Sequence, residues 1–165
     1  MKRSRGIAVS GVFSALAVVV MWLGALSGLG TYASPLMAGV ALIPVGLLLG
    51  KRTQGLSFAA VSLLCLLLSA DWEENLLFIG LFGWYPILRP GLAKIKNPLR
   101  LAVKLLIFNV MSVSMELLVM RVLVPQSEKT WILILLLVTG NITFLLYDRL
   151  LPRLTILLAR RLKLR

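Results

Sequence analysis

Histidine is absent from this chain of 165 residues, and cysteine occurs once, as Cys65. The sequence therefore offers no imidazole base, no histidine metal ligand, no intramolecular disulfide and no cysteine-based metal cluster. It also lacks a G-x-S-x-G nucleophile motif and a glycine-rich phosphate-binding loop. These absences argue against an enzyme, so we expect no catalytic residues, no bound metal and no cofactor.

Acidic residues are scarce as well. Six Asp and Glu stand against 18 Lys and Arg, which gives a formal net charge of +12. Apolar residues are abundant: they make up 59% of the chain, and the mean hydropathy is +0.96, whereas soluble domains have about 45–50% apolar residues. Because the cations stand at the ends of apolar runs, they suit anionic lipid headgroups better than nucleic acid. The composition predicts a membrane protein whose partner is lipid and not nucleic acid.

Long apolar runs predict an all-α fold in which six transmembrane helices form one bundle. A helix needs about 20 residues to cross the hydrocarbon layer. The expected spans are residues 7–29, 32–50, 55–70, 75–88, 101–124 and 131–150. The fourth span would cover only about 21 Å as a helix. It must therefore use its flanking residues, thin the bilayer or lie partly inside the bundle.

The distribution of Lys and Arg orients the bundle. With the amino terminus in the cytoplasm, every Lys and Arg except Arg121 and Lys129 falls on the inner side. Both termini are therefore expected in the cytoplasm, and the chain is expected to be a multi-pass protein of a cell membrane. Asp71, Glu73 and Glu74 then lie in a short outer loop. Such a loop carries acids because it is solvated, and a lid over an outer pocket is the alternative.

Polar side chains lie inside the fifth and sixth expected spans. Asn109, Ser112 and Glu116 share one helix face, and Asn141 lies near the middle of the sixth span. A carboxylate inside a membrane faces the bundle interior, a partner or a water-filled cavity. Glu116 is therefore either a structural partner of Arg121 or of a neighbouring helix, or a ligand-binding group. Hydrogen bonding between helices explains Asn141, and a cavity lined by Asn109, Glu116 and Asn141 is the alternative.

Two aromatic residues stand at the outer ends of expected spans, Tyr32 and Trp72. Amphipathic rings prefer the headgroup level of a membrane, so both are expected to anchor helix ends there. The alternative is that Trp22, Tyr32 and Trp72 together cover a pocket that opens outward.

Small residues indicate a docking face on the first span. Ala8, Gly11 and Ala15 lie on one stripe of the helix, and such a stripe lets another helix approach closely. That helix belongs either to this bundle or to a separate subunit.

The chain divides into a transmembrane domain, residues 1–150, and a basic cytoplasmic tail, residues 151–165. In the tail, leucines share one helix face and arginines take the others. This pattern predicts an amphipathic helix on the cytoplasmic leaflet or against a cytoplasmic partner. At the inner end of the sixth span, Asp148 and Arg149 are interpreted as a local ion pair.

The opening stretch RGIAVSGVFSALAVVV, the six spans and the two inner termini resemble the substrate-binding S component of energy-coupling-factor transporters. The stretches FGWYPILRP and GNITFLLYD also resemble small membrane proteins of Gram-positive bacteria. The resemblance implies that a vitamin-like small molecule is captured in an outer pocket. A transmembrane coupling subunit and two cytoplasmic ATPases would then drive its release inward. The substrate-binding residues that it implies are Glu116, Asn109, Asn141, Trp72 and Tyr32. The docking residues that it implies are Gly11 and Ala15.

Two other classes of function stay open at this point. One is a non-catalytic scaffold or regulatory subunit of a cell-envelope complex, which would co-purify with partner proteins and no small molecule. The other is a membrane enzyme that acts on lipid. That enzyme would need Glu116, Asp148 or the outer acids to hold a metal ion.

Overall fold

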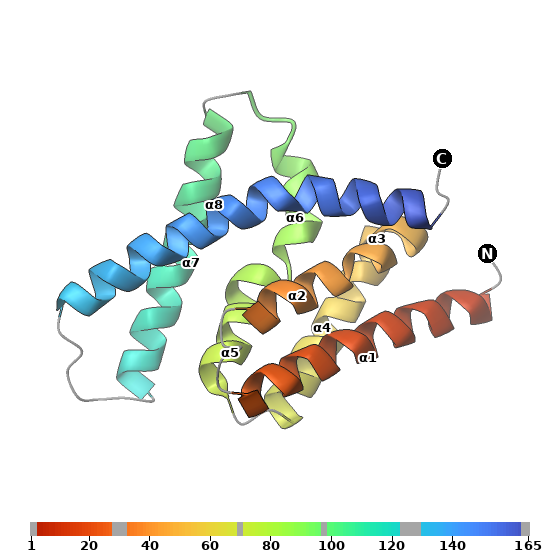
Figure 1. Ribbon diagram of the computed structural model, residues 1–165, viewed down its shortest axis with the longest axis horizontal. Helices are drawn as coiled ribbons and strands as arrows, with labels where there is room; N and C mark the ends of the chain where they lie inside the picture. The colour runs from red at the N-terminus through yellow and green to blue at the C-terminus, as the bar shows by residue number, and fades with distance from the viewer. Residues whose placement is uncertain (1–2, 28–32, 69–70, 97–98, 123–129, 163–165) are drawn as a thin grey trace.

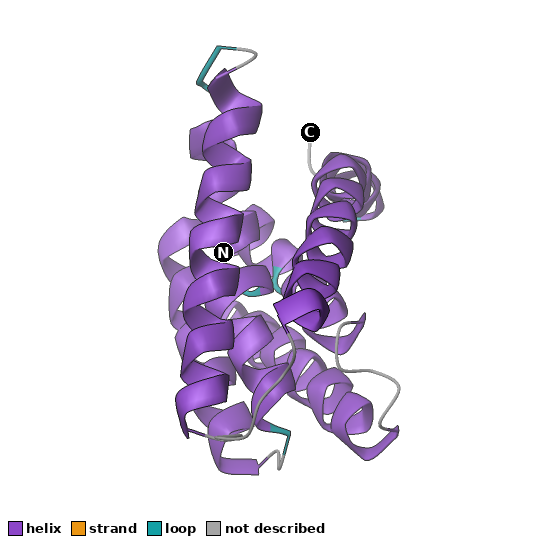
Figure 2. Cartoon of the chain, turned by 90° about the vertical axis from the view of Figure 1, so that its left-hand side faces the viewer, coloured by secondary structure: helices purple, strands orange, loops and turns teal. Residues whose placement is uncertain are grey.

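The computed structural model describes residues 3–27, 33–68, 71–96, 99–122 and 130–162. Every element in these ranges is helical (Figure 2). The elements are α1 (Arg3–Ser27), α2 (Ala33–Ala41), α3 (Ile43–Leu49), α4 (Lys51–Leu68), α5 (Trp72–Leu77), the π-helix η1 (Phe78–Phe82), α6 (Tyr85–Leu92), α7 (Leu99–Val122) and α8 (Thr130–Arg161). The all-α class expected from the sequence is confirmed.

These helices follow the order of the six expected spans. α1, α4, α7 and α8 are single helices, whereas the second unit joins α2 to α3 and the fourth joins α5, η1 and α6. Figure 1 shows the first turn of α1 and the last turn of α8 at the same end of the molecule.

A proline marks the break between α2 and α3 inside the second unit, and a glycine marks the end of that unit. Pro44 stands in the first turn of α3, where it interrupts the hydrogen bonds that would continue α2. α3 ends at Gly50, whose φ of 89° is a conformation that L side chains rarely adopt. The N–H of Gly50 donates to the carbonyl of Gly46 at 3.1 Å, and α4 begins at the next residue.

The fourth unit is longer and less regular than its predicted range of residues 75–88. Helical structure begins at Trp72 and reaches Leu92. In the middle, the N–H of Gly83 donates to the carbonyl of Phe78 at 2.8 Å, five residues earlier. A π-helical turn of this kind is rare and widens the helix locally.

Close packing accompanies the π-helical turn. A Cβ atom on Gly80 would lie 2.7 Å from Cε of Met115 in α7, and one on Gly83 would lie 2.6 Å from Cε2 of Phe58 in α4. Real Cβ contacts are not this short. The two glycines therefore allow α7 and α4 to approach the fourth unit from both sides.

Two clusters of buried apolar side chains hold the helices together. One joins α3, η1, α6, α7 and α8; its buried members are Ile43, Leu81, Phe82, Tyr85, Leu92, Phe108, Phe144, Tyr147 and Leu151. The other joins α1, α2, α4 and η1; its buried members are Ala17, Met21, Ala38, Leu42, Val61, Cys65 and Phe78. Cys65 is thus a packing residue.

α8 continues without a break beyond residue 150, although it contains Pro152. Leu151 is 2% exposed and belongs to the first cluster, and Leu158 packs against that cluster. The beginning of the expected tail therefore packs against the other helices.

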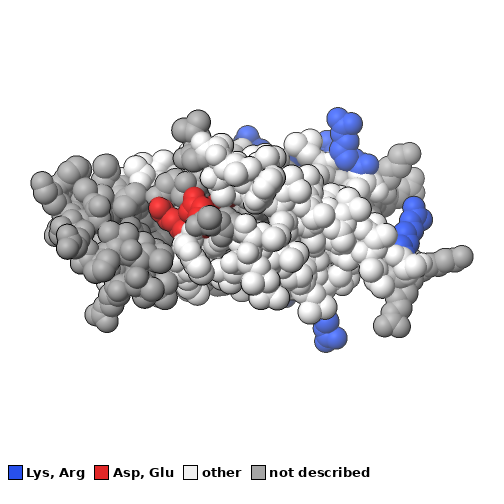
Figure 3. Space-filling view, turned by 90° about the horizontal axis from the view of Figure 1, so that it is seen from below, with Lys and Arg blue, Asp and Glu red and all other residues white. Residues whose placement is uncertain are grey.

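Much of the molecule's outer surface is apolar. α1 is the helix in the described ranges that is long and apolar enough to cross a membrane, with a mean hydropathy of 2.2 over Ser4–Ser27. Apolar side chains on other helices also point outward: Leu56 and Leu67 of α4 are 72% and 73% exposed. Figure 3 shows acidic side chains near one end of the molecule, Lys and Arg toward the other, and a largely uncharged surface between them.

Candidate functional site

Two of the predicted substrate-binding residues bond to each other where α7 crosses α8 (Figure 1). Nδ2 of Asn109 donates to Oδ1 of Asn141 at 3.0 Å, and Nδ2 of Asn141 donates back to Oδ1 of Asn109 at 2.8 Å. Each amide also donates to a carbonyl one turn earlier in its own helix, Leu105 and Leu137. The predicted hydrogen bonding between helices is confirmed.

Trp72, another predicted site residue, is not brought to this amide pair. Trp72 begins α5, a different unit of the fold, and is 52% exposed. The side chains of Tyr32 and Glu116 lie outside the described residues. The outer pocket that these residues were expected to line therefore stays a prediction.

The structure singles out another acidic residue, Glu74. Its side chain is 0% exposed, whereas its neighbour Glu73 is exposed. The hydroxyl of Ser34, in the first turn of α2, donates to Oε1 of Glu74. Oε2 is buried and has no hydrogen-bond partner in the described part of the chain. The expectation that the acidic stretch is simply solvated is therefore wrong for Glu74.

Local bonds place Glu74 inside the fold. Oδ1 of Asp71 accepts the N–H of Glu74 at 3.0 Å, so Asp71 caps the start of α5. The next residue, Asn75, is also 0% exposed and donates to the carbonyl of Cys65 in α4 at 3.2 Å. The first turn of α5 is thereby attached to α4, with Glu74 directed into the interior.

A glycine of α1 closes over this carboxyl group. A Cβ atom on Gly24 would lie 2.5 Å from Cβ of Ser34 and 2.6 Å from Oε1 of Glu74. Only a residue without a side chain allows α1 to lie this close. Burial raises the pKa of Glu74; the hydrogen bond from Ser34 opposes the rise, and the charge of Asp71 adds to it.

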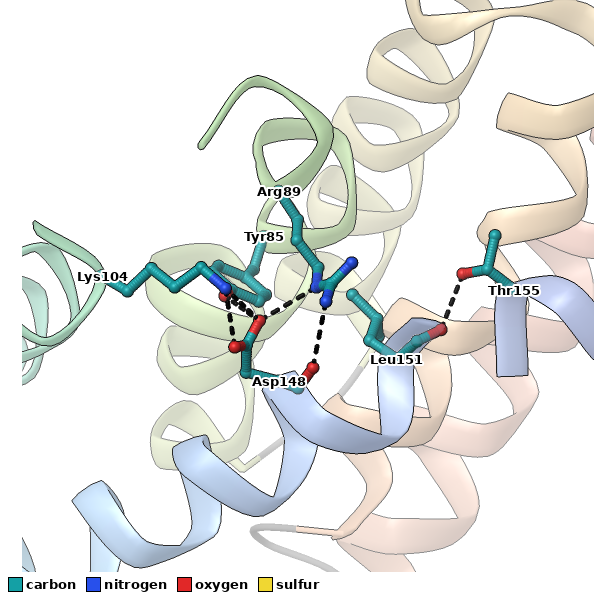
Figure 4. A network of polar contacts seen from close by, with 6 residues as sticks. All are labelled: Tyr85, Arg89, Lys104, Asp148, Leu151 and Thr155. Carbon is teal, nitrogen blue, oxygen red and sulfur yellow. Dashed lines mark hydrogen bonds and ion pairs between the residues drawn. The ribbon is translucent and has the colours of Figure 1, made fainter. Parts of the chain in front are cut away.

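A second buried polar cluster surrounds Asp148 of α8 (Figure 4). Nζ of Lys104 in α7 donates to both carboxylate oxygens, at 2.8 and 2.6 Å. From α6, the hydroxyl of Tyr85 donates to Oδ1 at 2.6 Å and Nε of Arg89 donates to the same oxygen at 2.9 Å. Asp148 thus joins three helices. Because two cations hold its carboxylate, it is poorly suited to bind a metal ion.

The proline in α8 makes one of these contacts possible. Pro152 has no N–H, so it cannot bond to the carbonyl of Asp148 four residues earlier. Nη2 of Arg89 donates to that carbonyl instead, at 3.3 Å. Arg89 thus holds both the backbone and the side chain of Asp148.

The interpretation of Asp148 and Arg149 as a local ion pair is wrong. Arg149 is exposed, and the partners of the Asp148 carboxylate in the described structure are Lys104, Arg89 and Tyr85. Adjacent residues of a helix point in different directions, so their side chains do not face each other. The missed signal was Lys104 itself, a cation inside the expected fifth span that needs a counter-ion there.

The predicted docking face on α1 is open. Gly11 and Ala15 are both exposed, and a Cβ atom on Gly11 would meet nothing within 4 Å. Ala17, on another side of the helix, is buried in the second cluster. α1 therefore packs on the other helices through one side and presents its small-residue stripe outward.

Comparison with known proteins does not add a family to these observations. No protein-family model, no curated protein and no solved structure matches this chain.

Proposed function

We propose that this chain is a six-span protein of the bacterial cytoplasmic membrane with both termini in the cytoplasm. The six helical units and the outward-facing apolar side chains support this placement. The exposed cations Lys51 and Arg52 lie at the start of α4, and the acidic stretch from Asp71 follows its end. This separation of charge (Figure 3) suits a cytoplasmic end rich in cations and an outer end that carries the acids.

Within that placement, the chain is the substrate-binding subunit of a membrane transporter. It captures a vitamin-like small molecule from the outer side for ATP-driven uptake by partner subunits. The observation that carries this proposal is Glu74, a fully buried carboxyl at the outer end whose Oε2 has no partner in the described structure. A buried oxygen without a partner is costly. A solute that donates a hydrogen bond or carries a positive charge would satisfy it.

The outward-facing stripe of small residues on α1 supports the proposal that a partner subunit binds there. Gly11 and Ala15 leave room for the backbone of another helix to approach. A transmembrane coupling subunit is the partner that this face suits, and two cytoplasmic ATPases complete the transporter.

Purification in mild detergent, followed by mass spectrometry of proteins and small molecules, tests the proposal. We expect ATPase subunits and a retained small molecule. Glu74→Gln is expected to lose the small molecule, while Glu73→Gln keeps it, because Glu73 is exposed and its replacement removes the same charge. Equal retention in both variants would contradict the role of Glu74. Partner proteins without any small molecule would favour a scaffold.

A further inference from the structure

A cavity of about 330 Å³ lies at the end of α4 opposite the Glu74 cluster, between the α3–α4 turn, α6 and the C-terminal part of α8. Its lining is mostly apolar, with polar groups from α4, α6 and α8. Residues of this lining include Ile43, Leu47, Lys51, Gln54, Arg89 and Ile156. Among the predicted site residues whose side chains the structure describes, none lines this cavity.

The polar groups that reach the cavity include donors without protein partners. Gln54 is 5% exposed, yet its side-chain amide has no hydrogen-bond partner among the described residues. Lys51 has no ion pair there either. Arg89 uses Nε and Nη2 on Asp148, which leaves Nη1 available. The cavity thus has an amide, an ammonium and part of a guanidinium that can donate to a ligand.

The charge around the cavity is positive. The described residues that line it include no Asp or Glu. The carboxylate nearest to its cations in the described structure, Asp148, is already shared by Arg89 and Lys104. Lys51 adds a further positive charge at the start of α4, where the helix dipole is also positive. An anion with several acceptor oxygens would balance these groups.

We propose that this cavity binds a phosphate group, held by Lys51, Gln54 and Arg89. The apolar lining favours a phosphate that carries hydrocarbon: Ile43 and Leu47 form the wall, and Ile156, which is 53% exposed, extends it to the outer surface. An anionic phospholipid of the cytoplasmic leaflet has this chemistry. The site depends on the membrane placement above, but not on solute transport.

Gly46 positions the amide of Gln54 at this site. A Cβ atom on Gly46 would lie 2.7 Å from Cδ of Gln54. An alanine at this position would push the amide away from α3. Gly46→Ala is therefore expected to weaken phosphate binding without a change of charge.

Native mass spectrometry of the purified chain in detergent tests the site. The protein is titrated with phosphatidylglycerol, with phosphatidylcholine of the same acyl chains and with inorganic phosphate. We expect phosphatidylglycerol to bind more tightly than phosphatidylcholine. Tight binding of inorganic phosphate alone would identify a soluble phosphate compound as the source of the group.

Two substitutions at the start of α4 provide the matched control. Both side chains are exposed, but Lys51 lines the cavity and its neighbour Arg52 does not. Lys51→Gln is expected to weaken binding about five-fold, and Arg52→Gln much less. Gln54→Leu, which keeps the charge, is expected to weaken binding as well.

Equal losses for Lys51→Gln and Arg52→Gln would overturn the proposal, because they would indicate general attraction to the basic end. Absence of binding to either phosphate source would also overturn it. Neither result concerns Glu74, so the substrate-binding proposal is tested separately by solute retention in Glu74→Gln.

Discussion

Nζ of Lys104 in α7 lies 2.6 Å from Oδ2 of Asp148 in α8, and their side chains are only 7% and 15% exposed. The ammonium group stands within the expected fifth span, where a charge without a partner is costly. The pair therefore fixes α7 against α8. The Asn109–Asn141 pair joins the same two helices further along.

Loss of the Asp148 carboxylate is expected to destabilise the fold strongly. Asp148→Asn would leave both Lys104 and Arg89 without a counter-ion, and removal of one partner from a buried pair costs about 3–5 kcal/mol. Lys104→Met is expected to cost less, because Asp148 keeps Arg89 and Tyr85. The melting temperature in detergent measures both effects.

Arg149→Gln is the control for these substitutions. Arg149 is adjacent to Asp148 in sequence but exposed, so its loss is expected to leave the melting temperature nearly unchanged. A larger effect of Arg149→Gln than of Asp148→Asn would contradict the described network.

The reciprocal amide pair gives a second prediction. Asn109→Leu and Asn141→Leu each remove the hydrogen-bond partner of the other amide between α7 and α8. The double variant is expected to be less destabilised than the sum of the single ones, with a coupling energy of about 1 kcal/mol. Thermal unfolding of the four proteins gives this energy. Strictly additive effects would mean that the pair contributes no mutual stabilisation.

Features of the fold that depend on local sequence could be predicted. The helical class follows from long apolar runs, and the end of α3 follows from Gly50, whose positive φ suits only glycine. The π-helical turn could not be predicted this way. The turn lies where Met115 and Phe58, which belong to other helices, pack against Gly80 and Gly83.

The candidate site depends even more on distant packing. In the sequence, Asp71, Glu73 and Glu74 are three equivalent acids of a short loop. In the structure they have different surroundings: Asp71 caps α5, and Glu74 is enclosed by Gly24 and Ser34. Gly24 and Ser34 belong to helices that are distant from these acids in the sequence. The amide pair of α7 and α8 was predictable because a polar residue inside an apolar helix needs a partner wherever the helix packs.

Gly24 and Gly11 give a matched pair of substitutions in α1. An alanine Cβ at Gly24 would meet Ser34 and Glu74 at contact distances that real structures do not show, whereas one at Gly11 would meet nothing within 4 Å. Gly24→Ala is expected to destabilise the fold by about 1–3 kcal/mol. Gly11→Ala is expected to be neutral or slightly stabilising, because alanine favours helix.

Thermal unfolding in detergent compares these two variants. Equal melting temperatures would contradict the close approach of α1 to the Glu74 cluster. Gly11→Leu additionally tests the docking face, because it fills the open stripe without touching the fold. We expect it to retain its melting temperature and to lose co-purifying membrane partners.

The raised pKa of Glu74 predicts a specific dependence of stability on pH. Burial favours the protonated carboxyl in the folded protein, with Ser34, Asp71 and the Cys65 thiol as the described polar groups near it. The contribution of Glu74 to the free energy of unfolding is therefore fully present below the ordinary carboxyl pKa. It is lost as the pH rises through the raised pKa of the folded state.

Glu74→Gln removes this titration but keeps a neutral side chain of similar shape. The melting temperature of the wild-type protein is therefore expected to fall relative to that of Glu74→Gln as the pH rises from the acid range. Glu73→Gln, which removes an exposed carboxylate one residue away, is the matched control and should follow the wild-type protein. A wild-type protein that gains stability over Glu74→Gln with rising pH would mean that the buried carboxylate is charged and paired. In that case a cation, and not a proton, would occupy the site.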